Sequence, residues 1–79
     1  MKDRITKKEI MRQITKLEDK LKVIKVKSKK GEEFLININA YLKDSKHWLK
    51  EKNYILAFES IIWSWAWLEI GEEIKILDN

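Results

Sequence analysis

The sequence predicts an all-α protein, an up-down-up bundle of three helices. Its 79 residues include no proline and only two glycines, so few positions interrupt a helix. Apolar residues recur at spacings of three and four in three successive segments. The connections between these segments are short and polar, which favours antiparallel neighbours. A chain of this length is expected to form a single domain, residues 1–79.

The first helix is expected at about residues 6–29. Thr6 and Glu9 have the spacing of a capping box, in which the two side chains bind free amides of the first turn. A narrow apolar stripe follows, formed by Ile10, Ile14, Leu17, Leu21 and Ile24. Gly31 is expected to end this helix in the left-handed conformation. Residues 21–27 also alternate as a strand would, but a lone strand would have no partner, so we prefer a helix.

The second helix is expected at about residues 32–52 and the third at about 54–76, with Asn53 in the turn between them. The third helix places large apolar groups around its whole axis, because three of the four tryptophans fall within residues 63–67. One apolar face should join the core; the residues expected in the core are Leu42, Leu49, Phe58, Ile61, Trp65 and Leu68. A second face carries Trp63, Trp67, Ile70 and Ile74. Either another protein chain covers this second face or the first helix wraps onto it.

A specific order of residues runs through positions 32–77 without a gap. It consists of Tyr41, Asp44, Ser45, Lys46, Trp48, Leu49, Tyr54, Ala57, Phe58 and the run from Trp63 to Gly71. This order resembles a family of small archaeal helical proteins known as domain of unknown function 357. The resemblance implies a three-helix bundle and no assigned reaction. The sequence departs from the family pattern at residues 52–53, at Ala66 and at Ile70; the added bulk at the last two positions implies a different helix spacing or groove.

Composition excludes several classes of protein. The chain has no cysteine, so neither disulfides nor thiolate chemistry can contribute. No apolar segment reaches the roughly 20 residues that a membrane-spanning helix needs. The first six residues are charged and no apolar signal segment follows them. We therefore expect a cytoplasmic protein with no membrane partner.

Two groups of polar residues have side chains that could bind a metal or act in acid–base catalysis. Asp44, His47 and Glu51 share one side of the second helix and have donor types that bind divalent metals, but lysines lie between them and His47 is the only histidine. Asp44 and Glu69 could act as paired carboxylates, although ion pairs or hydrogen bonds with tyrosine explain them more simply. We therefore predict a protein that is not an enzyme and that holds no metal and no cofactor.

Charge is segregated along the chain. Residues 1–30 contain twelve lysines and arginines against four acids, whereas residues 31–79 contain five lysines against nine acids. An aromatic surface that stacks nucleic-acid bases needs cations beside its rings, but residues 54–74 contain no lysine or arginine. The aromatic residues of the third helix are therefore more typical of a protein interface.

The favoured function is a non-enzymatic helical module for protein interaction or oligomerisation, with a second copy or another protein bound at Trp63, Trp67, Ile70 and Ile74. The alternative is a nucleic-acid-binding accessory protein whose basic first helix contacts phosphates. The residues of that alternative contact are Arg4, Lys8, Arg12, Lys16 and Lys20.

Overall fold

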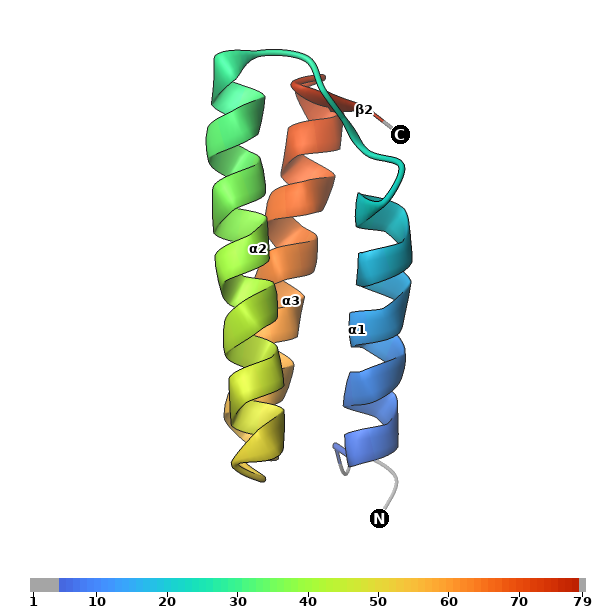
Figure 1. Cartoon of the computed structure of the whole chain (residues 1–79), viewed down its shortest axis with the longest axis vertical. Helices are drawn as coiled ribbons and strands as arrows, with labels where there is room; N and C mark the ends of the chain where they lie inside the picture. Colours follow the sequence, from blue (N-terminus) through green and yellow to red (C-terminus); the bar gives the residue numbers. More distant parts are fainter. Residues whose placement is uncertain (1–4, 79) are drawn as a thin grey trace.

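The structure is a computed structural model that describes residues 5–78. It consists of three helices in an up-down-up bundle: α1 (Lys7–Leu21), α2 (Lys29–Lys50) and α3 (Tyr54–Glu73) (Figure 1). The helices contain 15, 22 and 20 residues, and the bundle measures 41 × 22 × 18 Å. The predicted all-α, three-helix architecture is confirmed.

Each helix begins at a residue whose side chain satisfies a free amide. The side-chain oxygens of Thr6, Ser28 and Asn53 accept hydrogen bonds from the amides three residues later, over 3.1, 3.2 and 3.1 Å. Such caps stabilise the first turn, whose amides have no partner within the helix. The cap at Thr6 and the position of Asn53 between α2 and α3 agree with the sequence prediction. The second bond of the predicted capping box does not form, because the carboxylate of Glu9 accepts from Arg12 and Gln13 instead.

The first connection differs from the prediction. The first helix ends at Leu21, not near residue 29, and the chain continues into a two-residue strand, β1 (Lys25–Val26). This strand pairs antiparallel with β2 (Leu77–Asp78), with Val26 opposite Leu77. The helical prediction was wrong here because it assumed that a strand at this position would have no partner, and the end of the chain supplies one.

Gly31 also has a different role from the predicted one. It lies in the first turn of α2, which begins at Lys29 and not at residue 32, and it does not adopt a positive φ. A Cβ atom at Gly31 would overlap the backbone carbonyl oxygen of Ile76. The same oxygen accepts a hydrogen bond from the amide of Lys27 over 2.9 Å. Glycine is therefore needed here for close approach of two backbones, not to end a helix.

The third helix ends earlier than predicted, at Glu73 instead of about residue 76. Lys75 adopts a φ of 66° and turns the chain toward β2. This turn brings Leu77 to the end of the core, where only 2% of its surface is exposed. The closing strand therefore contributes to the core as well as to the short ladder.

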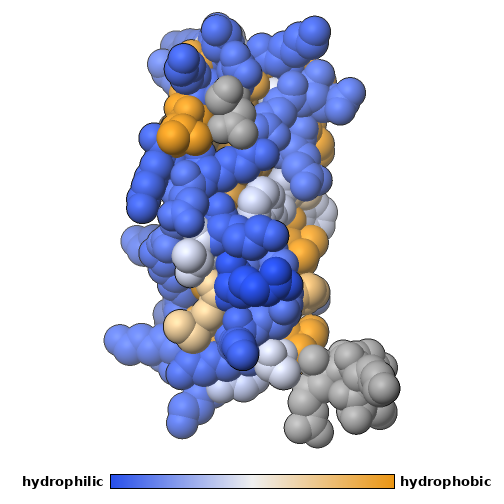
Figure 2. All heavy atoms as spheres, turned by 90° about the vertical axis from the view of Figure 1, so that its right-hand side faces the viewer, coloured by the Kyte–Doolittle hydropathy of each residue, from blue (hydrophilic) through white to orange (hydrophobic). Residues whose placement is uncertain are grey.

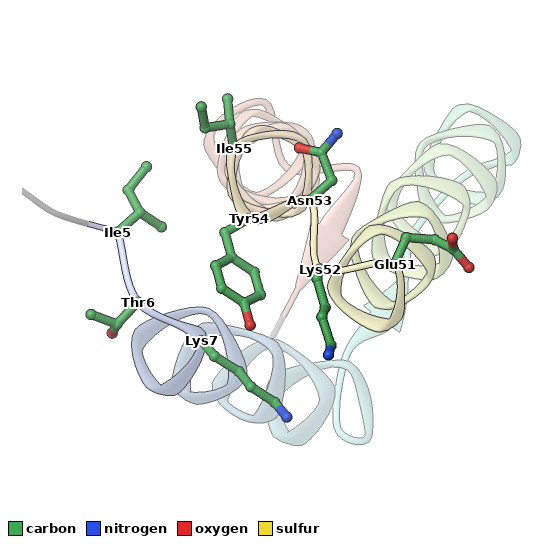
Figure 3. A pocket seen from close by; sticks show the side chains of 8 residues that line it. All are labelled: Ile5, Thr6, Lys7, Glu51, Lys52, Asn53, Tyr54 and Ile55. Atoms are coloured by element: carbon green, nitrogen blue, oxygen red, sulfur yellow. The ribbon is translucent and has the colours of Figure 1, made fainter.

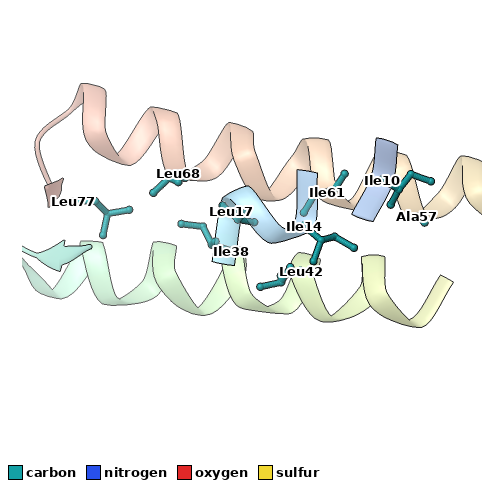
Figure 4. Close-up of a cluster of buried hydrophobic side chains, with 9 residues drawn as sticks. All are labelled: Ile10, Ile14, Leu17, Ile38, Leu42, Ala57, Ile61, Leu68 and Leu77. Atoms are coloured by element: carbon teal, nitrogen blue, oxygen red, sulfur yellow. The ribbon is translucent and has the colours of Figure 1, made fainter. Parts of the chain in front are cut away.

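The core lies between the three helices (Figure 4). Its buried apolar residues are Ile10, Ile14, Leu17, Ile38, Leu42, Ala57, Ile61, Leu68 and Leu77. The predicted burial of Leu42, Ile61 and Leu68 is confirmed. Leu49, Phe58 and Trp65 are only partly buried and pack against this cluster from its border.

Small residues bring α2 and α3 together. Ser45 and Ser64 are fully buried. The hydroxyl of Ser45 donates to the carbonyl of Ala57 over 2.8 Å, and the hydroxyl of Ser64 donates to the carbonyl of Ile38 over 2.7 Å. Each bond joins a side chain of one helix to the backbone of the other, which requires the two helix axes to lie close together. Most of the contacts between helices are made by this pair.

Candidate interaction surface

The α2–α3 pair has two sides, and α1 covers only one of them. On the covered side, Lys20 of α1 forms an ion pair with Glu72 over 3.3 Å, and its Nζ lies 6.0 Å from the centre of the Trp65 ring. Lys46 of α2 forms an ion pair with Glu18 of α1. These contacts show which flank of α3 and which flank of α2 face α1.

The other side of the pair carries a row of aromatic and aliphatic residues from both helices. We call this surface the open face, and define it by Phe34, Tyr41 and Trp48 of α2 and by Trp63, Trp67, Ile70 and Ile74 of α3. Two ring contacts join the helices across it. The rings of Phe34 and Trp67 meet edge to face with their centres 4.7 Å apart, and those of Tyr41 and Trp63 stack at 6.3 Å.

The four residues predicted as a partner interface share this flank of α3. Trp63 is 57% exposed, Ile70 is 51% exposed and Ile74 is 54% exposed. Trp67 is only partly buried, and its ring packs on Phe34. The alternative in which the first helix wraps onto this face does not occur, because α1 lies against the opposite flank at Glu72 and Trp65.

Sequence reasoning missed the contribution of α2 to the open face. Phe34, Tyr41 and Trp48 all belong to the broad apolar face of that helix, and all three remain partly exposed. The breadth of that face was the available signal, because a helix that touches its neighbours along one stripe needs a narrower one. The surface therefore extends over two helices.

Acidic residues border the open face. Asp44 of α2 follows Tyr41 by three residues, and Glu51, which caps the end of α2, follows Trp48 by three. On α3, Glu59 precedes Trp63 by four residues and Glu73 follows Ile70 by three. Residues at these spacings are neighbours on a helix surface. All four carboxylates are exposed.

The lysines of α2 lie on the other flank. Lys43, Lys46 and Lys50 form one stripe by helical spacing, and the ion pair of Lys46 with Glu18 directs this stripe toward α1. The bundle thus has a basic side built from α1 and this stripe. Figure 2 shows the side of the molecule toward α1, which is mostly hydrophilic, with apolar residues gathered along its right-hand edge.

The residues of the predicted nucleic-acid contact do not form one uniform surface. Lys8, Arg12 and Lys16 are exposed in a single stripe of α1, but Arg12 also forms an ion pair with Glu9 over 2.6 Å. Lys20 turns toward α3 and Glu72. Arg4 lies outside the described residues.

The carboxylates considered for chemistry lie on different surfaces. Asp44 borders the open face, whereas Glu69 and Glu9 line a shallow depression between α1 and α3. Within residues 5–78, no group of three or more histidine, aspartate and glutamate side chains is arranged to hold a metal ion. The set Asp44, His47 and Glu51 is therefore not brought together as a metal site.

A second depression lies at the end of the bundle where α1 and α3 begin (Figure 3). Tyr54 extends toward α1 across it, and the ammonium groups of Lys7 and Lys52 lie at its border. Glu51 also lines the depression, with its side chain directed away from Tyr54. Among the described residues, the depression is therefore bordered by two ammonium groups, a phenol and one carboxylate.

Among residues 5–78, no helix combines the length and the apolar character required to cross a membrane.

Comparison with known proteins agrees with the fold. No curated protein matches the chain. A crystal structure of a DUF357 protein from Archaeoglobus fulgidus is similar, with a TM-score of 0.83 and 36% sequence identity over 92% of this chain and 91% of that chain. The model of the DUF357 family, described as a protein of unknown function, matches residues 12–77. The chain therefore belongs to the DUF357 family, as its tryptophan-rich second half indicated.

Proposed function

We propose that this chain is a non-enzymatic helical interaction module and that the open face is its binding surface. The observation that carries the proposal is the exposure of Trp63, Ile70 and Ile74, each about half accessible, beside the partly exposed rings of α2. Contiguous apolar surface on a small protein marks a site of interaction. Tryptophan and tyrosine are enriched at protein interfaces, since they bury a large area at a small entropic cost.

The arrangement suits a helical partner. Two antiparallel helices with aligned apolar residues present the same kind of surface on both sides of the pair, and α1 already occupies one side. A further helix can cover the open face in the same manner. It can come from a second copy, which in a two-fold dimer buries the same residues of both chains, or from another protein.

The non-enzymatic part of the proposal rests on the side chains that the sequence offers. The chain has no cysteine, and its single histidine, His47, is exposed on α2. The carboxylates of Asp44 and Glu69 lie on different surfaces, Asp44 beside the open face and Glu69 in the depression between α1 and α3. We expect no hydrolytic or transfer activity from such a set.

Pull-down experiments with a surface variant test the proposal. The variant Trp63→Lys with Ile70→Lys places two charges on the open face, and because both residues are about half exposed it should keep the helical circular dichroism of the parent. We expect the parent to retain proteins from nuclease-treated lysate that the variant loses. The control Ile36→Lys, at a residue of α2 that is 68% exposed and outside the open face, should behave as the parent. Identical capture by all three proteins would contradict the proposal, and loss of helical signal in the double variant would show that this face is part of the core.

A second candidate function follows from the exposed stripe of Lys8, Arg12 and Lys16 on α1. Such a stripe can contact phosphates without reading bases, so binding to nucleic acid should be weak and should fall steeply with salt. Fluorescence anisotropy with labelled RNA and DNA at low and physiological salt measures it. Absence of binding at low salt removes this candidate, and binding that prefers one sequence contradicts a purely electrostatic contact.

A further inference from the structure

The charges along the two sides of the open face are of one sign. Asp44 of α2 and Glu51 just after α2 border one side, and Glu59 and Glu73 of α3 border the other. α3 itself supplies no cation, since residues 54–74 contain no lysine or arginine. The sides of the open face are therefore acidic.

Among residues 5–78, the cations beside this surface lie toward its ends. Lys30 lies in the first turn of α2 and forms an ion pair with Glu33 over 3.5 Å. Lys75 follows α3, and Lys52 lies in the turn between α2 and α3. None of the three reaches the middle of the surface, where Tyr41 stacks on Trp63.

A second copy of the chain fits this surface poorly. In a two-fold dimer, the acidic borders of one chain meet the acidic borders of the other, and like charges brought together at an interface oppose association. A head-to-tail contact, in which α1 of one copy lies on the open face of another, fits no better. Ile10, Ile14 and Leu17 of α1 are already buried in its own chain. Its outer surface keeps Met11, which is 48% exposed, among mostly charged residues, and so offers little apolar area.

We infer that the occupant of the open face is an amphipathic helix of a different protein, with an apolar stripe flanked on both sides by lysine or arginine. The apolar stripe of such a helix covers Trp63, Ile70 and Ile74, and its flanking cations meet Asp44 and Glu59. Ile74 follows Trp63 by eleven positions, so the contact extends over about 16 Å at 1.5 Å per helical residue. This inference rests on the proposed function and names the chemistry of its partner.

Two synthetic peptides provide the test. Both are helices of about 18 residues with the same leucine stripe, and they differ only in the flanking positions, which are all lysine in one peptide and all glutamate in the other. Fluorescence anisotropy of the labelled peptides against the full chain measures affinity at low and physiological salt. We expect the lysine peptide to bind at least tenfold more tightly, with a difference that shrinks as salt rises.

Surface variants separate this inference from general attraction between opposite charges. Asp44→Lys with Glu59→Lys changes only exposed side chains and should reverse the preference between the two peptides. Asp19→Lys with Glu32→Lys changes the net charge equally, but Asp19 belongs to α1 and neither residue borders the open face; this variant should still prefer the lysine peptide. Trp63→Lys with Ile70→Lys should abolish binding of both peptides.

The outcomes distinguish the inference from the proposed function. If the glutamate peptide binds equally or better, and Trp63→Lys with Ile70→Lys removes that binding, the inference is overturned and the open face remains a binding surface. If both peptides bind and that double variant binds them unchanged, both conclusions fail. If neither peptide binds, the inference is overturned, and the proposed function is decided by the pull-down described above together with sedimentation. A dimer or a captured protein that Trp63→Lys with Ile70→Lys loses retains the proposed function. A monomer whose captured proteins are unchanged in that variant defeats it.

Discussion

The contact between α2 and α3 and the packing of α1 against that pair are built from different kinds of side chain. α2 and α3 meet through small buried residues, and the hydroxyls of Ser45 and Ser64 bond to the backbone of the facing helix. α1 is attached through the large side chains of Ile10, Ile14 and Leu17, together with ion pairs to α2 and α3. The α2–α3 contact therefore needs small side chains at Ser45 and Ser64, whereas the α1 contact depends on large apolar side chains. Substitutions that remove side-chain volume should lower the free energy of unfolding most where α1 packs. Substitutions that add volume should lower it most where two backbones lie close together.

The largest effect is expected at Leu17. This residue is fully buried on the inner side of α1, and Leu17→Ala removes apolar contacts and leaves a cavity. We expect the free energy of unfolding to fall by about 2–5 kcal/mol, measured by urea denaturation. That is a large part of the stability of a small domain. Met11→Ala is the matched control, because Met11 lies on the same helix and is 48% exposed; equal effects of the two changes would show that α1 is not held by this stripe.

Gly31→Ala should be the next most damaging change. In an unobstructed helix this substitution stabilises by about 1 kcal/mol, but here the new Cβ overlaps the carbonyl oxygen of Ile76. We expect a loss of about 1–3 kcal/mol, as for other overpacked sites. Hydrogen exchange at the amide of Lys27, which bonds to the same oxygen, should become faster.

Gly71→Ala is the control for that prediction. A Cβ at Gly71 would lie 2.6 Å from Cδ1 of Leu77, at the end of a side chain that can rotate. The loss should therefore be smaller than at Gly31. A larger loss at Gly71 would show that the core beside Leu77, and not the contact with the backbone of Ile76, limits this end of the bundle.

Ser64→Ala tests the hydrogen bond between α2 and α3. The hydroxyl donates to the carbonyl of Ile38 over 2.7 Å in a fully buried position. Its removal should cost about 0.5–1.5 kcal/mol, measured by thermal or chemical unfolding. Ser60→Ala, one turn earlier and partly exposed, should leave stability nearly unchanged. A stabilising Ser64→Ala would show that apolar packing outweighs this bond.

The smallest effect concerns Glu9 at the beginning of α1. The guanidinium of Arg12 donates two bonds to its carboxylate, over 2.6 and 3.3 Å, and Gln13 adds a third over 3.1 Å, so the pKa of Glu9 lies below its usual value. A depressed folded-state pKa contributes stability above the unfolded pKa, and this contribution is lost as pH falls through the folded pKa. Arg12→Ala should raise the pKa of Glu9, as measured by carboxyl NMR titration. Lys8→Ala changes charge without removing a bond to Glu9, and an equal rise in that variant would contradict the assignment to Arg12.

Much of the fold followed from local spacing. The three apolar periodicities predicted three helices, and the polar connections predicted their antiparallel order. Thr6 was placed correctly at a helix start and Asn53 in the turn between the second and third helices. The two apolar faces of the third helix were also visible, since helical spacing fixes which side chains share a face. These features depend on neighbours within a few residues, so the sequence contains them directly.

Contacts between distant segments decided the rest. The pairing of Val26 with Leu77 converted an expected helix end into a strand, and the approach of Ile76 gave Gly31 its role. The position of α1 determined which flank of α3 is covered, and so left Trp63 and Ile70 exposed beside the rings of α2. Periodicity shows that a residue has an apolar face to bury, but which element covers that face depends on packing between segments far apart in the chain, and only the tertiary structure resolves it.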